Sequence, residues 1–194
     1  MIRKIMILTI FMGLCLDLGF GMVTFEADND HSFISFSVRH MMISQVKGQF
    51  KDYSVVISAN PDNIVQSSVV AVIKTASIDT GIDKRDEDLR GPKYFDVAKY
   101  PEMVFKSTRI EKEGSYYIAH GTLTLHGVTK TIALPFKITG QTEFPKGKKR
   151  VGIDANYTLN RKDYGIIWDP VLDKGGTMVG DEIKVEILLE VVEK

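Results

Sequence analysis

The chain has 194 residues, with 25 basic and 25 acidic side chains, so its formal net charge at neutral pH is zero. This balance argues against a nucleic acid as partner, because phosphate binding needs a concentrated basic face. The one basic cluster, residues 146–150, follows a proline and contains a glycine, which favours a solvated loop tip over a binding patch.

The N-terminal segment has the pattern of a secretory signal peptide. Two basic residues precede an uncharged apolar run, residues 5–16, which is shorter than the about 20 residues that span a bilayer. Glycines occupy the −3 and −1 positions of a cleavage after Gly21. The alternative is an uncleaved membrane anchor, and the shortness of the run argues against it. We therefore expect residues 1–21 to be a signal peptide, residues 22–194 to form one domain, and the protein to reside in the periplasm.

The expected mature chain must be stable through its core alone. Removing 21 of the 194 residues leaves 173, enough for one well-buried domain and few for two. The single cysteine, Cys15, leaves with the signal, so the mature chain can form no disulfide and can carry out no thiol catalysis.

Apolar and polar residues alternate with period two in one segment after another, which is the pattern of half-buried strands. In chain order the apolar members are Ile34, Phe36 and Val38; Met103 and Phe105; Leu123 and Leu125; Ile132, Leu134, Phe136 and Ile138; Val151, Ile153, Ala155, Tyr157 and Leu159; and Ile183, Val185, Ile187, Leu189 and Val191. Only residues 83–91, a charged stretch before a proline, look helical.

Turn residues separate these segments. Glu113-Gly114, His126-Gly127 and residues 145–147 each lie between alternating runs and predict hairpins. Successive hairpins with almost no helix predict an all-β protein with an antiparallel sheet. At about eight strands such a sheet closes into a barrel or stacks as a sandwich, and alternation alone does not choose between the two.

Five longer blocks of the sequence resemble the YceI-like family, and they come in the order of that family. They are residues 31–50, 77–108, 121–130, 160–169 and 175–187. The resemblance spans nearly the whole expected mature chain. It implies an extended, eight-stranded, antiparallel, lipocalin-like β-barrel with a short helical segment near residues 83–91. It also implies a periplasmic protein that binds polyisoprenoids or other long-chain amphiphiles.

The inward faces of such a barrel are rich in Phe, Ile, Val and Met, which suit a flexible hydrocarbon. An eight-stranded barrel has room for side chains or for one small ligand. The alternative is that these residues fill the barrel themselves. Trp168, the only tryptophan, either lines the pocket mouth or caps the core. The residues that we expect to line a ligand pocket are Phe36, Val38, Met41, Phe105, Phe136, Ile153 and Trp168.

Arg39 ends a strand whose other face is apolar, which makes it a candidate to bind a ligand head group. Its guanidinium could donate hydrogen bonds to a pyrophosphate or a quinone. Asp79 and Asp86 are the expected acidic companions at this head-group site. The alternative is a structural ion pair between Arg39 and Asp79, Asp83 or Asp86, and the sequence does not choose between the two.

Catalytic and metal-binding patterns are missing from the sequence. The four histidines show no metal-ligand spacing such as HExxH, and there is no GxSxG, P-loop or GxGxxG after a strand. We therefore expect no enzyme activity, no catalytic residue, no metal and no cofactor.

Two function classes remain. The first is a carrier or sequestering protein of the cell envelope for a polyisoprenoid, an isoprenoid quinone or a fatty-acid derivative. The second is a stress-related structural or interaction module whose barrel is packed with its own side chains. A homodimer and peripheral contact with a membrane are compatible with both.

Overall fold

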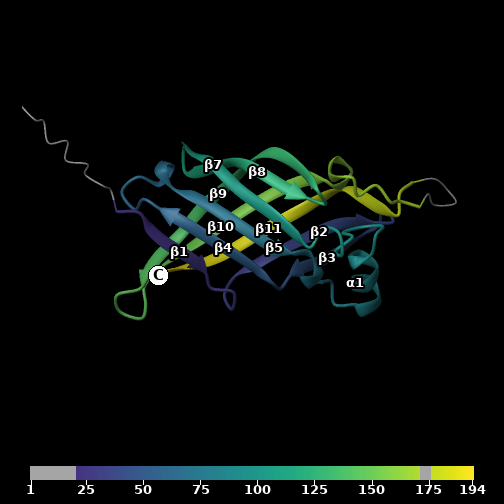
Figure 1. Cartoon of the computed structure of the whole chain (residues 1–194), viewed down its shortest axis with the longest axis horizontal. Helices are drawn as coiled ribbons and strands as arrows, with labels where there is room; N and C mark the ends of the chain where they lie inside the picture. The colour runs from purple at the N-terminus through teal and green to yellow at the C-terminus, as the bar shows by residue number, and fades with distance from the viewer. Residues whose placement is uncertain (1–20, 171–175) are drawn as a thin grey trace, which may run out of the picture.

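The computed structural model describes residues 21–170 and 176–194 (Figure 1). The predicted signal peptide, residues 1–21, lies almost wholly outside the described residues. The strands are β1 (Val23–Ala27), β2 (Phe33–His40), β3 (Ser44–Phe50), β4 (Tyr53–Ala59), β5 (Ser68–Lys74), β6 (Ile78–Asp79), β7 (Glu102–Glu113), β8 (Tyr116–Leu125), β9 (Val128–Glu143), β10 (Lys149–Asn160) and β11 (Val179–Glu193). The helices are α1 (Asp83–Arg90) and the short 3-10 helices η1 (Ile64–Gln66), η2 (Thr75–Ser77) and η3 (Arg161–Tyr164).

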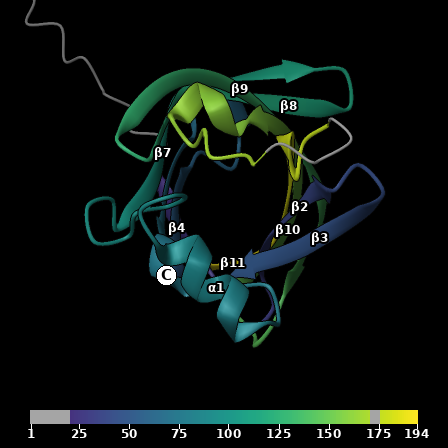
Figure 2. The same cartoon turned by 90° about the vertical axis from the view of Figure 1, so that its right-hand side faces the viewer.

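Eight of these strands form a closed antiparallel ring in the order β1-β4-β5-β7-β8-β9-β10-β11, which the pairing of β1 with β11 completes. The long strand β11 has two partners on this side: residues up to Leu188 pair with β2, and residues 191–193 pair with β1. Strands β3 and β6 continue the sheet beyond β2. Figure 2 looks along the ring and shows the strands around a common centre. The predicted eight-stranded barrel is confirmed, and the sandwich is excluded.

The predicted turns and the predicted helix are also confirmed. His126 and Gly127, at φ 51° and 75°, form the two-residue connection between β8 and β9, as expected of a hairpin turn with both central residues in the left-handed region. Helix α1 is followed directly by Gly91 and Pro92, and proline cannot continue a helix. Within the described ranges, no helix is long and apolar enough to cross a membrane.

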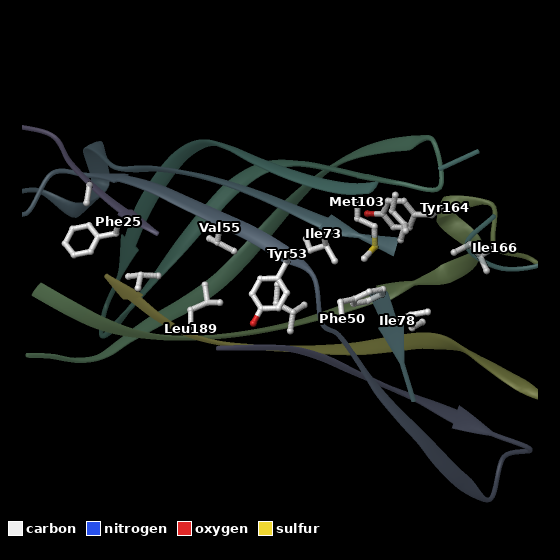
Figure 3. Close-up of a cluster of buried hydrophobic side chains, with 14 residues drawn as sticks. Phe25, Phe50, Tyr53, Val55, Ile73, Ile78, Met103, Tyr164, Ile166 and Leu189 are labelled. Carbon is white, nitrogen blue, oxygen red and sulfur yellow. The ribbon is translucent and has the colours of Figure 1, made fainter. Parts of the chain in front are cut away.

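The buried side chains lie inside the ring and extend along it, from Phe25 near one end to Ile166 near the other (Figure 3). The Phe36 ring on β2 lies close to β3 because Gly48 has no side chain. A Cβ atom on Gly48 would come within 2.5 Å of the Phe36 ring. The Phe36 ring also contacts Phe50, with the ring centroids 5.7 Å apart. The buried apolar side chains therefore form the inner surface of the barrel.

Candidate ligand-binding cavity

The barrel encloses a cavity of about 790 Å³. Every strand of the ring contributes side chains to its lining, and most of these side chains are apolar. The volume falls within the about 300–1,000 Å³ that is usual for small-molecule sites. The cavity is therefore large enough for a ligand of that class.

The burial pattern of the strands shows that side chains do not fill the interior. On β11, Ile183, Val185 and Ile187 face the cavity and are only half-buried, whereas Lys184 and Glu186 between them are exposed on the outside. In a barrel packed to the density of an ordinary core, inward-facing residues would be fully buried. The half-buried state of these three residues reflects the open space in front of them.

Aromatic side chains close the cavity at the end where α1 lies. Leu89 of α1 and the following Tyr94 and Phe95 are part of the lining. The Phe95 ring meets Phe50 edge-on, with the centroids 5.7 Å apart, and Tyr94 meets Trp168 in the same manner at 5.2 Å. Among the described residues, no lining residue at this end is exposed.

Arg161 in η3 is a buried charged residue at the closed end. Only 3% of its surface is exposed, and the residue borders the cavity. It donates hydrogen bonds to the carbonyl oxygens of Ile166 at 2.7 Å, Trp168 at 2.9 Å, Gly180 at 3.0 Å and Val179 at 3.1 Å, and to Asp181 Oδ1 at 3.3 Å. Because these bonds use its donors, Arg161 ties the segment after β10 to the start of β11, and its role is structural.

The opposite end of the cavity is open. All the exposed residues of the lining lie there: they are Pro61, Ile138, Gln141, Thr142, Glu143 and Lys149. Five of the six belong to the β9–β10 hairpin, which Figure 1 shows at the end of the barrel that holds the C-terminus, away from α1. Polar groups are thus concentrated at the opening, as in sites that bind an apolar chain with a polar end.

Comparison with known proteins places the chain in a family. A family model described as a YceI-like domain matches residues 25–191. The chain belongs to the YceI-like family. It is 38% identical to a UPF0312 protein of Yersinia pestis over 144 residues, which cover 74% of this chain and 75% of the relative. It is 36% identical to the protein YceI of Salmonella newport over the same number of residues, with the same coverage of each chain.

Solved structures share the barrel. A YceI protein of Campylobacter jejuni is 34% identical and superposes with a TM-score of 0.70, covering 80% of this chain and 90% of the other. BcnA of Burkholderia cenocepacia has a TM-score of 0.74 at 23% identity, over 87% and 99% of the two chains. A polyisoprenoid-binding domain from Saccharophagus degradans has a TM-score of 0.65 at 17% identity, over 89% and 99%. At such low identity the last two show the fold alone.

In this YceI-like protein, five of the seven predicted pocket residues line the cavity. Phe36 and Val38 come from β2, Phe105 from β7, Phe136 from β9 and Ile153 from β10. The alternation of their strands is what points them inward. Their contact with a ligand stays a prediction.

The other two predicted pocket residues lie outside the cavity lining. Met41 is in the turn between β2 and β3, at φ 48°, and 41% of its surface is exposed. Trp168 covers the closed end from outside, with Tyr94 on one side and the Lys93 ammonium 5.2 Å from the centre of its ring. Of the two predicted roles for Trp168, its position matches the cap.

The three predicted head-group residues are not brought together at the cavity. Arg39 is exposed and donates to the carbonyl oxygen of Met42 at 3.2 Å. It forms no ion pair with any described residue, so the predicted alternative of a pair with an aspartate is wrong. The physical reason for its position is strand alternation: Val38 points inward, so Arg39 points outward.

The two aspartates have structural partners of their own. Asp79 pairs with Lys51, and this hydrogen-bonded ammonium, followed by the Gly81 N–H, holds the pKa of Asp79 below its ordinary value. Asp86 is buried, and its Oδ1 accepts hydrogen bonds from the Thr80 N–H at 2.9 Å and from the Thr80 hydroxyl. It therefore fixes the entry of the chain into α1.

The tyrosines near the cavity are held in the neutral form. Burial raises the pKa of Tyr94 and of Tyr157, both of which border the cavity. Burial, with smaller effects of Tyr157 and Asp163, raises the pKa of Tyr164 to about 12. The charged residues of the described lining, Arg161 at one end and Glu143 and Lys149 at the other, leave the middle of the cavity without a charged side chain.

Proposed function

We propose that this protein binds a long-chain amphiphile inside the barrel: a polyisoprenoid, an isoprenoid quinone or a fatty-acid derivative. The observation that carries the proposal is the apolar cavity of about 790 Å³, closed by aromatic side chains at one end and open among polar residues at the other. The second function considered above, a module packed with its own side chains, does not account for this space. Binding rather than catalysis is the role that the cavity supports.

The shared fold gives further support. The barrel of the Saccharophagus degradans domain, which binds a polyisoprenoid, superposes over nearly all of that domain. A cavity closed at one end also suits a linear molecule that enters with its tail first. Its tail would lie against the lining, and its head group would stay near Gln141, Thr142 and Lys149 at the opening.

The hydrophobic effect supplies the affinity in this proposal. Burial of a methylene group is worth about 0.8 kcal/mol, so a tail of about 15 such groups gains roughly 12 kcal/mol before the ordering of the chain is subtracted. That gain does not depend on the head group. Chain length is therefore the property that the cavity selects most strongly.

The proposed role is that of a carrier or sequestering protein in the cell envelope. It depends on the signal-like segment, residues 1–21, whose cleavage would leave Met22 at the N-terminus. N-terminal sequencing of protein from the extracytoplasmic fraction tests this location. An intact N-terminus in the membrane fraction would contradict it.

The binding proposal is tested by mass spectrometry of an organic extract of protein purified from its native envelope, where a single class of long-chain lipid is expected. A second test is displacement of the dye N-phenyl-1-naphthylamine by fatty acids of increasing length. Affinity should rise about fourfold per methylene and then level off when the cavity is full. A clean extract together with affinities that do not depend on length would refute the proposal.

A further inference from the structure

The connection between β9 and β10 has a composition that the binding of a lipid tail does not use. Residues 141–149, here called the mouth hairpin, contain Lys146, Lys148 and Lys149, and all three side chains are exposed. None of them forms an ion pair with a described residue. The one acidic residue of the hairpin, Glu143, accepts a hydrogen bond from the Gly147 N–H. The hairpin therefore carries a net positive charge, with three lysines against one glutamate.

An aromatic side chain stands beside these lysines. Phe144 has 71% of its surface exposed, the largest exposed fraction of any aromatic residue in the described part of the chain. The hairpin holds it there: the Phe144 N–H donates to the Lys148 carbonyl at 3.0 Å, and the Arg150 Nε donates to the Phe144 carbonyl at 2.8 Å. A single exposed apolar residue is ordinary on a protein surface. An exposed aromatic residue that is held beside three unpaired lysines calls for a functional explanation.

The position of the mouth hairpin at the open end of the cavity suggests such a function. Gln141, Thr142, Glu143 and Lys149 belong to it and also border the open end of the cavity. Ile138, which precedes the hairpin on β9 and is 39% exposed, also borders the cavity. The hairpin that carries the lysines and Phe144 therefore also supplies most of the exposed residues of the described cavity lining.

We propose that the mouth hairpin docks the open end of the barrel onto an anionic lipid bilayer. Phe144 enters the boundary between head groups and acyl chains, and the lysines contact the anionic head groups, which is the usual combination in peripheral membrane binding. The proposal rests on the proposed lipid-binding function for its purpose. A docked mouth lets a hydrocarbon tail pass between bilayer and cavity with little exposure to water.

A bilayer fits this surface better than a protein partner. The attraction of lysines to an anionic membrane surface needs no matched arrangement of acidic side chains, only negative charge spread over a plane. The other end of the barrel also exposes apolar side chains, with Ile43 at 84%, but the cavity is closed there. That end therefore provides the matched controls.

The test is co-flotation of the protein, over its expected mature span from residue 22, with vesicles of phosphatidylcholine alone or of phosphatidylcholine and phosphatidylglycerol in equal parts. Wild type should float with the anionic vesicles and much less with the neutral ones. The double variant Lys146→Gln/Lys148→Gln should bind the anionic vesicles roughly 30-fold more weakly, at about fivefold per lysine. Phe144→Ser should weaken binding roughly tenfold or more.

Two control variants remove a pair of lysines and an exposed apolar side chain at other places on the surface. Lys47→Gln/Lys184→Gln removes two exposed lysines from the outer faces of β3 and β11, and Ile43→Ser removes the exposed side chain at the closed end. Neither should change vesicle binding. Thermal melts establish that each variant is folded, so a loss of binding cannot be a loss of structure.

Dye binding in solution without vesicles separates this proposal from the proposed function. The Lys146→Gln/Lys148→Gln variant should bind N-phenyl-1-naphthylamine as wild type does, because neither lysine lines the cavity. Dye binding with no flotation of wild type would overturn the docking proposal and leave lipid binding intact. Equal losses in the mouth and control variants would overturn it as well. Flotation that depends on the hairpin, in a protein that binds no dye or lipid, would support docking and refute the proposed function.

Discussion

Ala71 on β5 is the residue at which the size of the cavity can be changed most directly. It borders the cavity at the point where the two clusters of buried residues meet, and it packs against both. Its neighbours across the sheet are Val55 on β4 and Phe105 on β7. Ala71 is small and only half-buried, so there is open space in front of its methyl group. We expect Ala71→Phe to divide the cavity in two.

The size of the effect follows from the carbon count. A phenylalanine side chain has about six more carbon atoms than alanine, so a tail that fills the cavity loses about six methylene positions, worth about 5 kcal/mol. That is between three and four orders of magnitude in Kd for a long fatty acid. A short fatty acid, which occupies only one part of the cavity, should lose far less. Stability should be unchanged or higher, since the new ring is itself buried.

The assay is displacement of the dye by long and short fatty acids, with a urea unfolding curve for each variant. Val70→Phe is the matched control, because Val70 directly precedes Ala71 on the same strand, faces outward and is 40% exposed. It should leave both affinities unchanged. Ala71→Phe that is stable and binds the long acid as wild type does would refute the placement of the ligand inside the barrel.

Three further predictions concern stability. Arg161→Lys should lower the free energy of unfolding by roughly 2 to 4 kcal/mol in urea titrations. The reason is that an ammonium group cannot reach all the carbonyl groups to which the guanidinium donates. A change below about 0.5 kcal/mol would contradict this prediction. The hydrogen bond from Arg150, then that from His31, lowers the pKa of Asp28, so its contribution is complete above the ordinary aspartate pKa and is lost as the pH falls through the lowered one. Melting curves of Asp28→Asn and wild type should therefore differ at pH 7 and converge as the pH falls through the lowered pKa of Asp28, and a constant difference would count against the pairing. Tyr164, with its pKa raised to about 12, should make wild type lose stability between about pH 10 and 12, and Tyr164→Phe should lose less over that range; identical alkaline unfolding would show that Tyr164 does not titrate as its burial implies.

Strand alternation predicted the inner surface of the barrel well. Every apolar residue of the alternating segments, such as Phe136 on β9 and Val185 on β11, borders the cavity. The reason is geometric: successive side chains of a strand point to opposite faces, so polarity of period two identifies the face that is shielded from water. No contact between distant segments had to be known for this prediction.

Three strands of the ring, β1, β4 and β5, were not recognised, and in β4 and β5 the polarity does not alternate throughout. β4 contains Val55 and Val56 in succession, and β5 contains Val69 and Val70. Val56 and Val70 are 37% and 40% exposed, so apolar residues lie on both faces of these strands. The pairing of β4 with β5 and β1 decides which of the valines face the cavity, and that pairing is a property of the whole ring.

The polar part of the site was less predictable from the sequence. Arg161 lies in a charged stretch whose sequence is typical of an exposed loop. The carbonyl groups that accept its hydrogen bonds belong to residues up to 19 positions away, so its burial could not be predicted from neighbouring residues. The position of the open end follows from the length of β9. Strand β9 continues past its last pairing with β8, at Phe136, and leads to the basic hairpin, so the hairpin projects at the end of the ring.

The closed end of the cavity is mostly apolar and the open end is mostly polar, so the two ends suit different parts of a ligand. This difference decides whether Arg39 could contact a head group. For Arg39 to contact a head group, the ligand would have to reach the outer face of β2 near the closed end, past the aromatic side chains of Tyr94 and Phe95. A tail-first ligand instead leaves its head group beside Lys149, where charge, solvent access and the mouth hairpin coincide. Selectivity for the head group then depends on a flexible lysine at the surface and is weak, because such an exposed contact contributes little. In the proposed binding mode, selectivity for length depends on the distance from the opening to the aromatic side chains at the closed end and is strong. A protein built in this way would discriminate among lipids by the size of the tail and would accept several head groups.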